Sequence, residues 1–337
     1  MTSAVSPVVT PAVTPAVTPA VTPTDIRVAA ARIAGHVRVT PIMQVAASEF
    51  GLPFANALTL KLELLQHVGS FKPRGAFNRV LAAGQLPDAG LVAASGGNHG
   101  AAVAFVARSL GIPAEVFVPS SSPAMKRDRI ASLGATVHVI EGLYDDAQVA
   151  AVQRQTETGA LAVHPFEHAD LVAGQGTMSL ELETQMSLVQ QGREFDTVLV
   201  ASGGGGFTAG QAAWFEGRKR VVSVEPITTQ CLNAARIAGE PVDVTVAGLA
   251  SDSLRARRLG TVAWSIVHPY VAHSVLVDDD AIGAAQKVLW DRLRLIVEPG
   301  GATAFAALLS GSYVPEADER LVVVVCGANC DPATVTG

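Results

Sequence analysis

The sequence predicts an α/β fold with mainly parallel sheets, because short β-branched runs alternate along the chain with alanine-rich segments of helical period. The runs at 114–119 (AEVFVP) and 196–202 (DTVLVAS) lack the polar alternation of a half-exposed strand, which is typical of strands buried on both faces. The stretches at 99–111 and 145–159 repeat apolar residues at helical spacing. A chain of 337 residues, 49% of them hydrophobic, is long enough for a large core or for two lobes that share one.

The N-terminal segment, residues 1–24, is predicted to be a disordered tail. Its repeat TPAVTPAVTPAVTP places a proline at every fourth position, which blocks a helix and removes hydrogen-bond donors from a strand. Globular sequence is expected to begin near Asp25, because 25–37 (DIRVAAARIAGHV) carries apolar residues at helical spacing. The further expected strands lie at 90–95, 135–142, 160–166, 220–226 and 320–329.

Composition and charge exclude several classes of function. The formal net charge is −6 and the 24 Lys and Arg residues are scattered, so nucleic acid is not an expected partner. No apolar run approaches the roughly 18 residues of a membrane span, and the N-terminus lacks the features of a secretory signal. We therefore expect a cytoplasmic protein without a membrane partner. The three cysteines are too few for a disulfide framework, and neither they nor the histidines have the spacing of a metal site.

Three loops that follow expected strands are rich in glycine or small residues. Residues 94–100 (ASGGNHG) and 201–210 (ASGGGGFTAG) each lead into a helix, where glycines let backbone N–H groups approach an anion such as phosphate. Residues 325–332 (VCGANCDP) close the last strand. Because ligands of such folds bind at the carboxyl ends of strands, these loops form the candidate site. Tight turns and a flexible linker are the structural alternatives.

The glycine loop at 201–210 also satisfies a dinucleotide-binding fingerprint. Gly204, Gly206 and Ala209 fit the pattern G-x-G-x-x-A after a strand, and Glu225 ends the next strand about 20 residues later. A nicotinamide-dependent oxidoreductase is therefore an alternative function. Two features disfavour it: the loop lies in the second half of the chain, and a nicotinamide cofactor leaves Lys72 unexplained.

Lys72 lies in the stretch SFKPRGA, residues 70–76, between Phe71 and Pro73. An ordinary lysine amine, with a pKa near 10.4, is a poor base at neutral pH, but it forms a Schiff base with an aldehyde cofactor. A phosphorylated aldehyde cofactor needs such a lysine, a phosphate-binding loop, and partners for its phenolic oxygen and its ring nitrogen. The alternative interpretation of Lys72 is a surface cation at the start of a helix.

Together these motifs resemble the fold type II pyridoxal-phosphate-dependent enzymes, and among them the serine and threonine dehydratases and the serine racemases. The resemblance covers residues 25–334, and the motifs GSFKPRGA, SGGNHG, GGGG and CGAN occur in the family's order. It implies two three-layer αβα lobes with mainly parallel sheets and pyridoxal 5'-phosphate between them. It also implies a large cofactor-binding domain of residues 25–85 and 168–337, a small domain of residues 86–167, and a homodimer or higher homo-oligomer.

The resemblance further implies a role for each motif. Lys72 is the Schiff-base lysine beside Phe71, Asn98 bonds the phenolic oxygen, and Cys326 faces the ring nitrogen. Glu298, in VEPGGA, is expected near the ring, with capping of the following helix as the alternative. The residues implied around the phosphate are Gly203, Gly204, Gly205 and Gly206. The residues implied around the substrate are Ser95, Gly96, Asn98 and His99.

The predicted function is an L-serine/L-threonine ammonia-lyase that gives a 2-oxo acid and ammonia. A thiol is only a weak partner for the ring nitrogen, which favours rapid loss of a β-substituent over other reactions. The alternatives within the family are a serine racemase and a β-replacement synthase. Racemases of the family place a serine two residues before the loop asparagine, where this chain has Gly96 and no proton to give. Metal-binding members carry an aspartate where this chain has Cys231, six residues after Glu225, so no divalent metal is expected.

Overall fold

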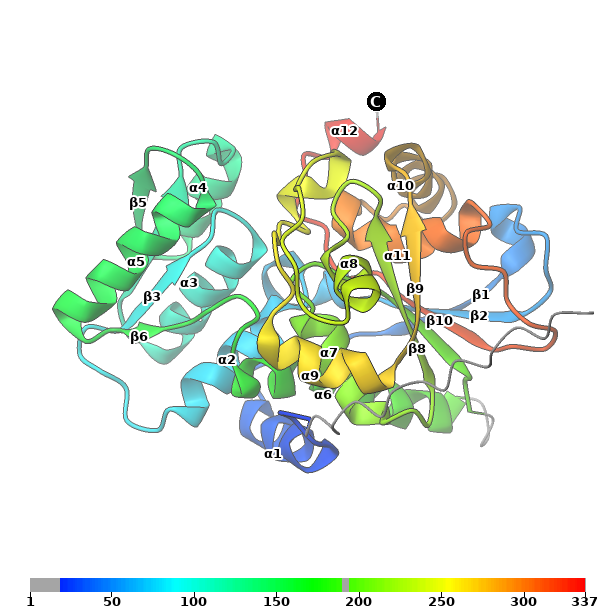
Figure 1. Cartoon of the computed structure of the whole chain (residues 1–337), viewed down its shortest axis with the longest axis horizontal. Coiled ribbons are helices and arrows are strands. Elements are labelled where there is room, and N and C mark those ends of the chain that lie inside the picture. The colour runs from blue at the N-terminus through cyan, green and yellow to red at the C-terminus, as the bar shows by residue number, and fades with distance from the viewer. Residues whose placement is uncertain (1–18, 190–193, 337) are drawn as a thin grey trace, which may run out of the picture.

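The computed structural model describes residues 19–189 and 194–336, and in this part of the chain it contains two separate β-sheets (Figure 1). The larger sheet has six strands in the order β1-β2-β10-β7-β8-β9, in which the β1–β2 pair is antiparallel and the other pairs are parallel. Its strands are β1 (Ile42–Ala46), β2 (Ala57–Lys61), β7 (Thr197–Ala201), β8 (Arg220–Pro226), β9 (Val271–Val277) and β10 (Leu321–Val324). The smaller sheet has four parallel strands in the order β5-β4-β3-β6. Its strands are β3 (Leu91–Ala94), β4 (Ala114–Pro119), β5 (Thr136–Ile140) and β6 (Leu161–Ala162).

Helices surround both sheets and give the molecule two lobes, which confirms the predicted α/β fold with mainly parallel sheets. The helices of the first half are α1 (Pro23–Ile33), α2 (Lys72–Ala82), α3 (Asn98–Leu110), α4 (Ala124–Ser132), α5 (Tyr144–Thr158) and α6 (Ala169–Val189). Those of the second half are α7 (Gly206–Phe215), α8 (Cys231–Ala238), α9 (Thr261–Tyr270), α10 (Asp279–Leu293), α11 (Pro299–Leu309) and α12 (Ala333–Thr336). Short 3-10 helices are η1 (Ala47–Phe50), η2 (Glu63–Leu65), η3 (His67–Gly69) and η4 (Leu249–Asp252).

The four-stranded sheet is covered on both faces, which explains its continuously apolar strands. Leu91 and Ala93 of β3 pack in one apolar cluster with α3 and α4, whereas Val92 and Ala94 pack in another with α5. Successive strand residues point to opposite faces, so a strand between two helical layers buries all of them. The whole sheet lies within residues 86–167, and the boundaries of the small domain stay a prediction.

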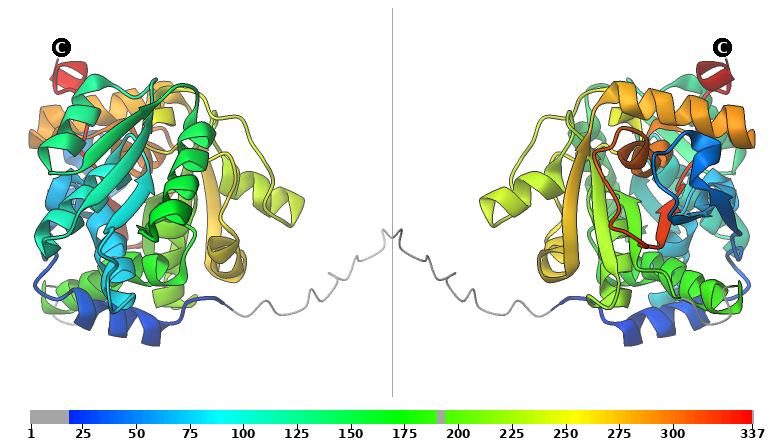
Figure 2. Two further views of the ribbon diagram at one scale, coloured as in Figure 1. Left: turned by 90° about the vertical axis from the view of Figure 1, so that its left-hand side faces the viewer. Right: turned by 90° about the vertical axis from the view of Figure 1, so that its right-hand side faces the viewer.

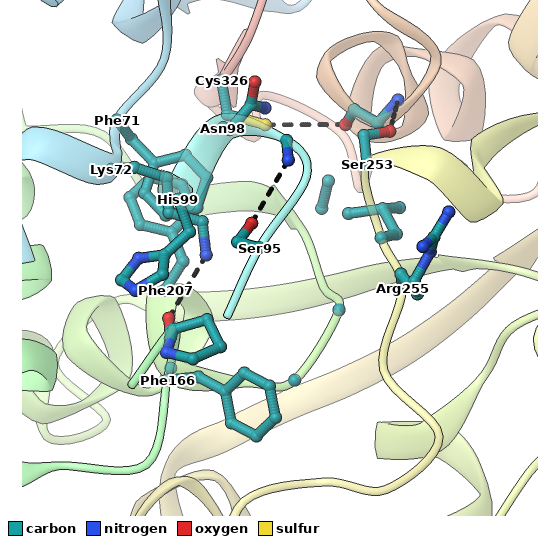
Figure 3. Close-up of a pocket in the computed structure, with 18 of the residues that line it drawn as sticks. Phe71, Lys72, Ser95, Asn98, His99, Phe166, Phe207, Ser253, Arg255 and Cys326 are labelled. Atoms are coloured by element: carbon teal, nitrogen blue, oxygen red, sulfur yellow. Dashed lines mark hydrogen bonds between the residues drawn. The ribbon is translucent and has the colours of Figure 1, made fainter. Parts of the chain in front are cut away.

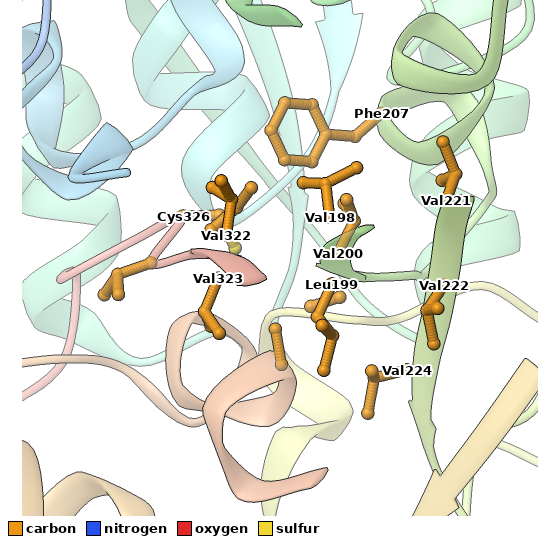
Figure 4. Close-up of a cluster of buried hydrophobic side chains, with 14 of the residues drawn as sticks. Val198, Leu199, Val200, Phe207, Val221, Val222, Val224, Val322, Val323 and Cys326 are labelled. Carbon is orange, nitrogen blue, oxygen red and sulfur yellow. The ribbon is translucent and has the colours of Figure 1, made fainter. Parts of the chain in front are cut away.

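The core of the larger lobe is centred on β7, β8 and β10, whose valines and leucines are almost fully buried (Figure 4). On one side, Val198 and Val200 of β7 lie next to Phe207, the second residue of α7. Helix α11 packs against the same strands and is buried over nearly its whole length. This packing fixes the carboxyl ends of β7 and β10, where two of the predicted loops begin.

The first helix begins slightly earlier than the sequence predicted. Helix α1 starts at Pro23, two residues before the expected start near Asp25, and Thr22 forms a capping box with Asp25. Val21 is also buried, with 2% of its surface exposed. Most of the predicted tail, residues 1–18, lies outside the described residues. Helix α1 packs on α2 and α6 and lies at the lower edge of the molecule in Figure 2.

Three strands escaped the sequence interpretation, namely β1, β2 and β9, and β6 is only two residues long where a strand was expected over 160–166. The polar residues in these strands concealed them: Lys61 ends β2 and is fully buried, and β9 has the sequence VAHSVLV with both polar and apolar residues partly exposed. None of the helices described here combines the length and the apolarity that crossing a bilayer requires.

Candidate active site

Segments far apart in the sequence meet in one pocket at the carboxyl ends of the parallel strands (Figure 3). The loops after β3, β7 and β10 contribute stretches that begin with Ser95, Gly203 and Cys326, and the first residue of α2 contributes Lys72. The pocket therefore receives residues from both lobes. Every residue that the sequence placed in the site lines it, namely Phe71, Lys72, Ser95, Gly96, Asn98, His99, Gly203, Gly204, Gly205, Gly206, Glu298 and Cys326.

The amine of Lys72 is held inside this pocket with few polar partners. Its Nζ donates a hydrogen bond of 3.3 Å to the carbonyl of Pro165 and lies 5.0 Å from the centre of the Phe71 ring. Phe71 in turn stacks on Phe207, with ring centres 3.9 Å apart. Burial lowers the pKa of Lys72 to about 8, against the opposing effect of the acidic groups Cys326 and Glu298. A lysine in this state can accept and return a proton near neutral pH, unlike a surface lysine.

A buried charge cluster anchors the helix that carries Lys72. Arg74 donates two hydrogen bonds of 2.8 Å to the carboxylate of Glu63 and one of 2.9 Å to Glu181. Lys61 completes the cluster through a 2.5 Å ion pair with Glu181. Because removing one partner would leave a buried charge unpaired, this cluster strongly constrains the position of the first turn of α2 relative to β2 and α6.

Three of the four glycines in the loop after β7 leave no room for a side chain. A Cβ on Gly204 would lie 2.6 Å from ring atoms of Phe166, and one on Gly206 would lie 2.9 Å from the Cβ of the same residue. Gly205 has a φ of +84°, which side chains disfavour, and a Cβ there would lie 2.9 Å from Ala263. Helix α7 begins at Gly206, so the free N–H groups of its first turn belong to this loop, an arrangement suited to an anion.

The loop after β3 is instead held by side-chain hydrogen bonds. Asn98 donates to Glu298 Oε1 at 2.5 Å and accepts from the side chain of Asn329 at 2.7 Å, and Asn329 also donates to the carbonyl of Val68. Burial raises the pKa of Glu298, an effect that Lys126 and the hydrogen bond from Asn98 oppose. Its second oxygen, Oε2, has no hydrogen-bond partner among the described residues.

Glu298 occupies the N-cap position of α11, but its side chain does not cap that helix. The N–H of Gly300 is donated to Ser253 Oγ at 3.0 Å, so a serine from another loop caps the helix in its place. This arrangement disfavours the capping alternative and leaves the Glu298 carboxyl in the pocket, hydrogen-bonded to Asn98.

His99 lines the pocket in a form that cannot donate from its side chain to a ligand. Its Nε2 lies 2.7 Å from the carbonyl of Val163, which can only accept, so Nε2 carries the proton. Burial lowers the pKa of His99 to about 3, and the charge of Lys72 adds to this effect. Nδ1 is therefore an unprotonated acceptor, and it has no partner among the residues described. This geometry disfavours the imidazole as a donor to a substrate carboxylate, and the place of His99 around the substrate stays a prediction.

Ser122 is a pocket residue that the sequence interpretation missed. It follows β4, and its side chain occupies the space in which a side chain on Gly96 would stand: a Cβ on Gly96 would overlap the Ser122 hydroxyl and lie 2.7 Å from its Cβ. The residue belongs to a stretch of three serines without a distinctive pattern, so only the fold could place it here. The Ser122 hydroxyl thus lies close to Gly96, the position at which racemases of the family carry a serine and this chain has no proton carrier.

Cys326 and Cys231 lie close to the pocket in different environments. Cys326 lines it, and burial raises the pKa of its thiol, as does the charge of Glu298, so the thiol is neutral. Cys231 begins α8, and its Sγ donates to the carbonyl of Gly203 at 3.0 Å. The Cys231 thiol therefore supports the glycine loop from behind.

Glu225 is not placed to bind a ribose, as the acidic residue of the dinucleotide fingerprint would be. Its buried carboxylate accepts the N–H groups of Leu232 and Asn233, both at 2.8 Å, at the start of α8, and it does not line the pocket. Burial raises its pKa to about 8. A carboxyl group engaged in this way cannot bind a ribose hydroxyl in the pocket. Within residues 19–189 and 194–336, no group of three or more His, Cys, Asp or Glu side chains could hold a metal ion.

Comparison with known proteins adds to this geometry. A family model described as "Pyridoxal-phosphate dependent enzyme" matches residues 33–327. A serine racemase of rice (Oryza sativa) is 34% identical over 317 residues, which cover 91% of this chain and 90% of that protein. An L-threonine ammonia-lyase of Geobacter sulfurreducens is 35% identical over 321 residues, with 93% and 77% covered. The solved structure of a threonine deaminase from T.th. has a TM-score of 0.84 at 32% identity and covers 92% of this chain and 99% of its own.

Proposed function

The chain belongs to the family of pyridoxal-phosphate dependent enzymes, and we propose that it is an ammonia-lyase that acts on L-serine and L-threonine. The observation that carries the proposal is the buried Lys72 amine, which lies in one pocket with a loop of four glycines and a neutral thiol. The relatives named as threonine ammonia-lyase and threonine deaminase support the same reaction class.

The pocket residues fit pyridoxal 5'-phosphate. When bound, this cofactor condenses with amines and withdraws electrons from the α-carbon of an amino acid. The glycine loop, in which a Cβ on Gly204, Gly205 or Gly206 would clash, suits the phosphate. The unpartnered Oε2 of Glu298 shows that the buried polar groups around Asn98 are incompletely satisfied. We propose that Gly203, Gly204, Gly205 and Gly206 hold the phosphate, that Phe71, Asn98 and Glu298 contact the ring and its phenolic oxygen, and that Cys326 faces the ring nitrogen.

In the proposed mechanism, Lys72 moves the protons. With its pKa lowered to about 8, its amine is free often enough at neutral pH to accept the α-proton of the substrate. The same group can then return that proton to the β-hydroxyl, which leaves as water. The neutral Cys326 thiol supplies little positive charge at the ring nitrogen, which favours immediate loss of the β-substituent over transamination. The loop Ser95–His99 orients the substrate carboxylate through backbone N–H groups and Ser95, with no contribution from the His99 imidazole.

The proposal is tested by spectroscopy and product analysis of the purified protein. We expect a visible absorption band that borohydride abolishes, and release of pyruvate from L-serine and 2-oxobutyrate from L-threonine, each with one equivalent of ammonia. A protein with the cofactor band that releases no ammonia from either amino acid would refute the ammonia-lyase activity. A bound nicotinamide in place of the band would refute the cofactor.

Serine racemisation is a second candidate, because the Ser122 hydroxyl occupies the place of a side chain at Gly96. Inversion of an α-carbon needs a proton carrier besides Lys72, and Ser122 reaches the pocket from the loop after β4, whereas Lys72 reaches it from α2. The sequence alone suggested that the absence of a side chain at Gly96 disfavours racemisation. The position of Ser122 removes that objection.

Chiral analysis of the serine that remains during turnover separates the two activities. D-Serine that accumulates at a rate comparable to pyruvate, and that disappears in Ser122→Ala, would establish the racemase. For the lyase we expect little D-serine from the wild type. The matched control is Ser121→Ala, since Ser121 adjoins Ser122 but does not line the pocket.

We also propose that the enzyme works in the cytoplasm as a homodimer or higher homo-oligomer on a small amino-acid substrate. The three cysteines are free thiols, which suits a reducing compartment. Light scattering during size-exclusion chromatography tests the oligomer, and a monomer at micromolar concentration would contradict it. Cell fractionation tests the compartment.

A further inference from the structure

Val68, four residues before Lys72, has a backbone conformation that valine rarely adopts. Its φ is +55° and its ψ is 20°, in the left-handed region, where a β-branched side chain is strained. Gly69 follows with a φ of +75°. Strain of this kind persists only where the surrounding structure imposes it, and it occurs most often at functional sites. The chain therefore keeps an unfavourable turn directly before the segment that carries Lys72.

The loop after β10 holds this turn in place. Asn329 donates a hydrogen bond of 2.8 Å to the carbonyl of Val68, and the N–H of Ala328 is donated to the carbonyl of Gly69 at 2.9 Å. The side chain of Asn329 also packs on Gly69, where a Cβ would lie 2.7 Å from Asn329 Oδ1. The turn thus presents the Val68 carbonyl to Asn329 and leaves room for the Asn329 amide beside it.

The two N–H groups of Asn329 fix the orientation of Asn98. The carbonyl of Val68 can only accept, so the Asn329 atom that faces it is Nδ2. The same Nδ2 lies 2.7 Å from Asn98 Oδ1 and donates its second N–H there. Asn98 must then direct its own Nδ2 away from Asn329, to the side where it donates to Glu298 Oε1 at 2.5 Å. In the described part of the chain, the second N–H of Asn98 Nδ2 has no acceptor, and Asn98 lines the active-site pocket (Figure 3).

Glu298 alone does not decide this orientation. Burial raises the pKa of Glu298, so its carboxyl can carry a proton and can face either end of the Asn98 amide. Asn329 allows only one of the two orientations, because the reversed amide of Asn98 would set two N–H groups against each other. The direction of the Asn98 side chain therefore depends on Asn329, which does not itself line the active-site pocket.

We propose that Asn329 is a positioning residue that directs the Nδ2 of Asn98 into the active-site pocket, where its remaining N–H is donated to the phenolic oxygen of the cofactor, and that the strained turn at Val68 orients Asn329 for this role. This inference rests on the proposed contact between Asn98 and the cofactor, and it adds the residues that make the contact directional. An N–H group in this position stabilises the phenolic oxygen in its ionised form. Asn329 acts on the cofactor only through Asn98.

The test measures how strongly the cofactor-free protein prefers pyridoxal phosphate over 3-deoxypyridoxal phosphate, which lacks the phenolic oxygen. Asn329→Asp replaces the donor by acceptors, so Asn98 should turn its Nδ2 toward the new carboxylate and its oxygen toward the pocket. We expect the ratio of the two dissociation constants to change by about 10-fold to 100-fold against pyridoxal phosphate, since a hydrogen bond to a charged acceptor is lost. Intrinsic differences between the two compounds cancel, because the same pair is compared in each protein.

Asn56→Asp is the matched control. Asn56 Nδ2 also donates to two acceptors, the carbonyls of Glu316 at 2.8 Å and Glu319 at 2.9 Å, but Asn56 lies outside the pocket. Both variants should lower the urea midpoint, whereas only Asn329→Asp should change the preference between the two compounds. Gly69→Ala displaces Asn329 without altering it, and it should shift the preference in the same direction by a smaller factor.

The possible outcomes separate this inference from the proposals on which it rests. A folded Asn329→Asp variant that keeps the wild-type preference would overturn the role of Asn329, and so would an equal change of preference in Asn56→Asp. A wild type without any preference for pyridoxal phosphate would refute the contact between Asn98 and the phenolic oxygen, and the inference with it. A wild type that binds neither compound would refute the cofactor itself.

Discussion

The loop after β7 and the loop after β3 both join a buried parallel strand to a helix, yet they line the pocket by different means. Residues 203–206 present only backbone, packed against Phe166 and Leu254, and a side chain at residues 204–206 has no space. Residues 95–99 present side chains that are tied to distant residues, such as Asn98 to Glu298 and His99 to Val163. The loop at 203–206 therefore depends on having no side chains, whereas the loop at 95–99 depends on hydrogen-bond partners from distant parts of the chain.

Both loops hold ligands in this interpretation, and the chemistry belongs to Lys72, so the largest effect should come from the lysine. Lys72→Ala should reduce ammonia release by about 10³-fold or more, since proton transfer by a positioned side chain contributes about 10²-fold to 10⁴-fold and the amine also attaches the cofactor. The assay is the initial rate of 2-oxo acid formation, with circular dichroism to verify folding. A folded variant that retained a tenth of the wild-type rate would contradict the role of Lys72.

The second effect in size concerns the backbone-built loop. Gly204→Val places a branched side chain against the Phe166 ring, and over-packing of this kind costs about 1–3 kcal/mol, which corresponds to about 5-fold to 150-fold in cofactor affinity. The measurement is the dissociation constant of pyridoxal phosphate from the quenching of tryptophan fluorescence. Gly217→Val is the control at a glycine where a Cβ meets nothing within 4 Å, although its φ of +78° adds backbone strain there. Unchanged cofactor affinity in Gly204→Val would show that the loop has more space than its packing indicates.

An effect of similar size, but on the stability of the fold, is expected at the side-chain-built loop. Gly96→Ser, which the sequence suggests as a way to introduce a proton carrier, meets the Ser122 side chain and should destabilise the protein by about 1–3 kcal/mol. The double variant Gly96→Ser with Ser122→Gly removes the overlap and should recover most of that stability. Urea unfolding of the three proteins measures both values. A single variant as stable as the wild type would show that Ser122 moves aside at little cost.

A further effect is a pH dependence of the cofactor-free protein. The pKa of Lys72 is about 8 in the folded chain and near 10.5 when the chain is unfolded, so between these values the unfolded chain binds a proton that the folded chain does not. The free energy of unfolding contributed by Lys72 therefore rises with pH across this window. Lys72→Met lacks the group, so it should be more stable than the wild type at pH 7, and the difference should shrink by pH 10. A difference in urea midpoint that stays constant with pH would contradict the lowered pKa.

The backbone-built loop was accessible from the sequence, and the side-chain-built loop only in part. Four adjacent glycines before a helix can be recognised as a binding loop from a short stretch of sequence. The same is true of the lysine between Phe71 and Pro73. By contrast, Ser122, Phe166 and Arg255 reach the pocket because of how the lobes pack, and their sequence neighbourhoods are ordinary. The tautomer of His99 likewise follows from the carbonyl of Val163, which is 64 residues away. Pairing across such separations leaves no periodic pattern in the sequence.

The fold shows the same division. Strands buried on both faces, such as β4 and β7, were predictable because their apolar runs are continuous. β2 was not, because it ends in Lys61, whose burial is made possible by Glu181 and Gln185 of a distant helix. The sequence around Lys61 cannot show that its hydrogen-bond acceptors lie more than a hundred residues later in the chain.

The position of β10 between β2 and β7 has a consequence for the timing of synthesis. The ribosome makes β2 well before its parallel partner, which consists of residues 321–324. At about 5–20 residues per second, β2 waits more than about 10 s with one edge unpaired, and the Cys326 loop joins the pocket only after that. The nascent chain can complete its smaller lobe during this interval. The pocket can close only after residues 321–326 have been made, so a stop before residue 321 yields a chain in which β2 and β7 lack the strand that lies between them.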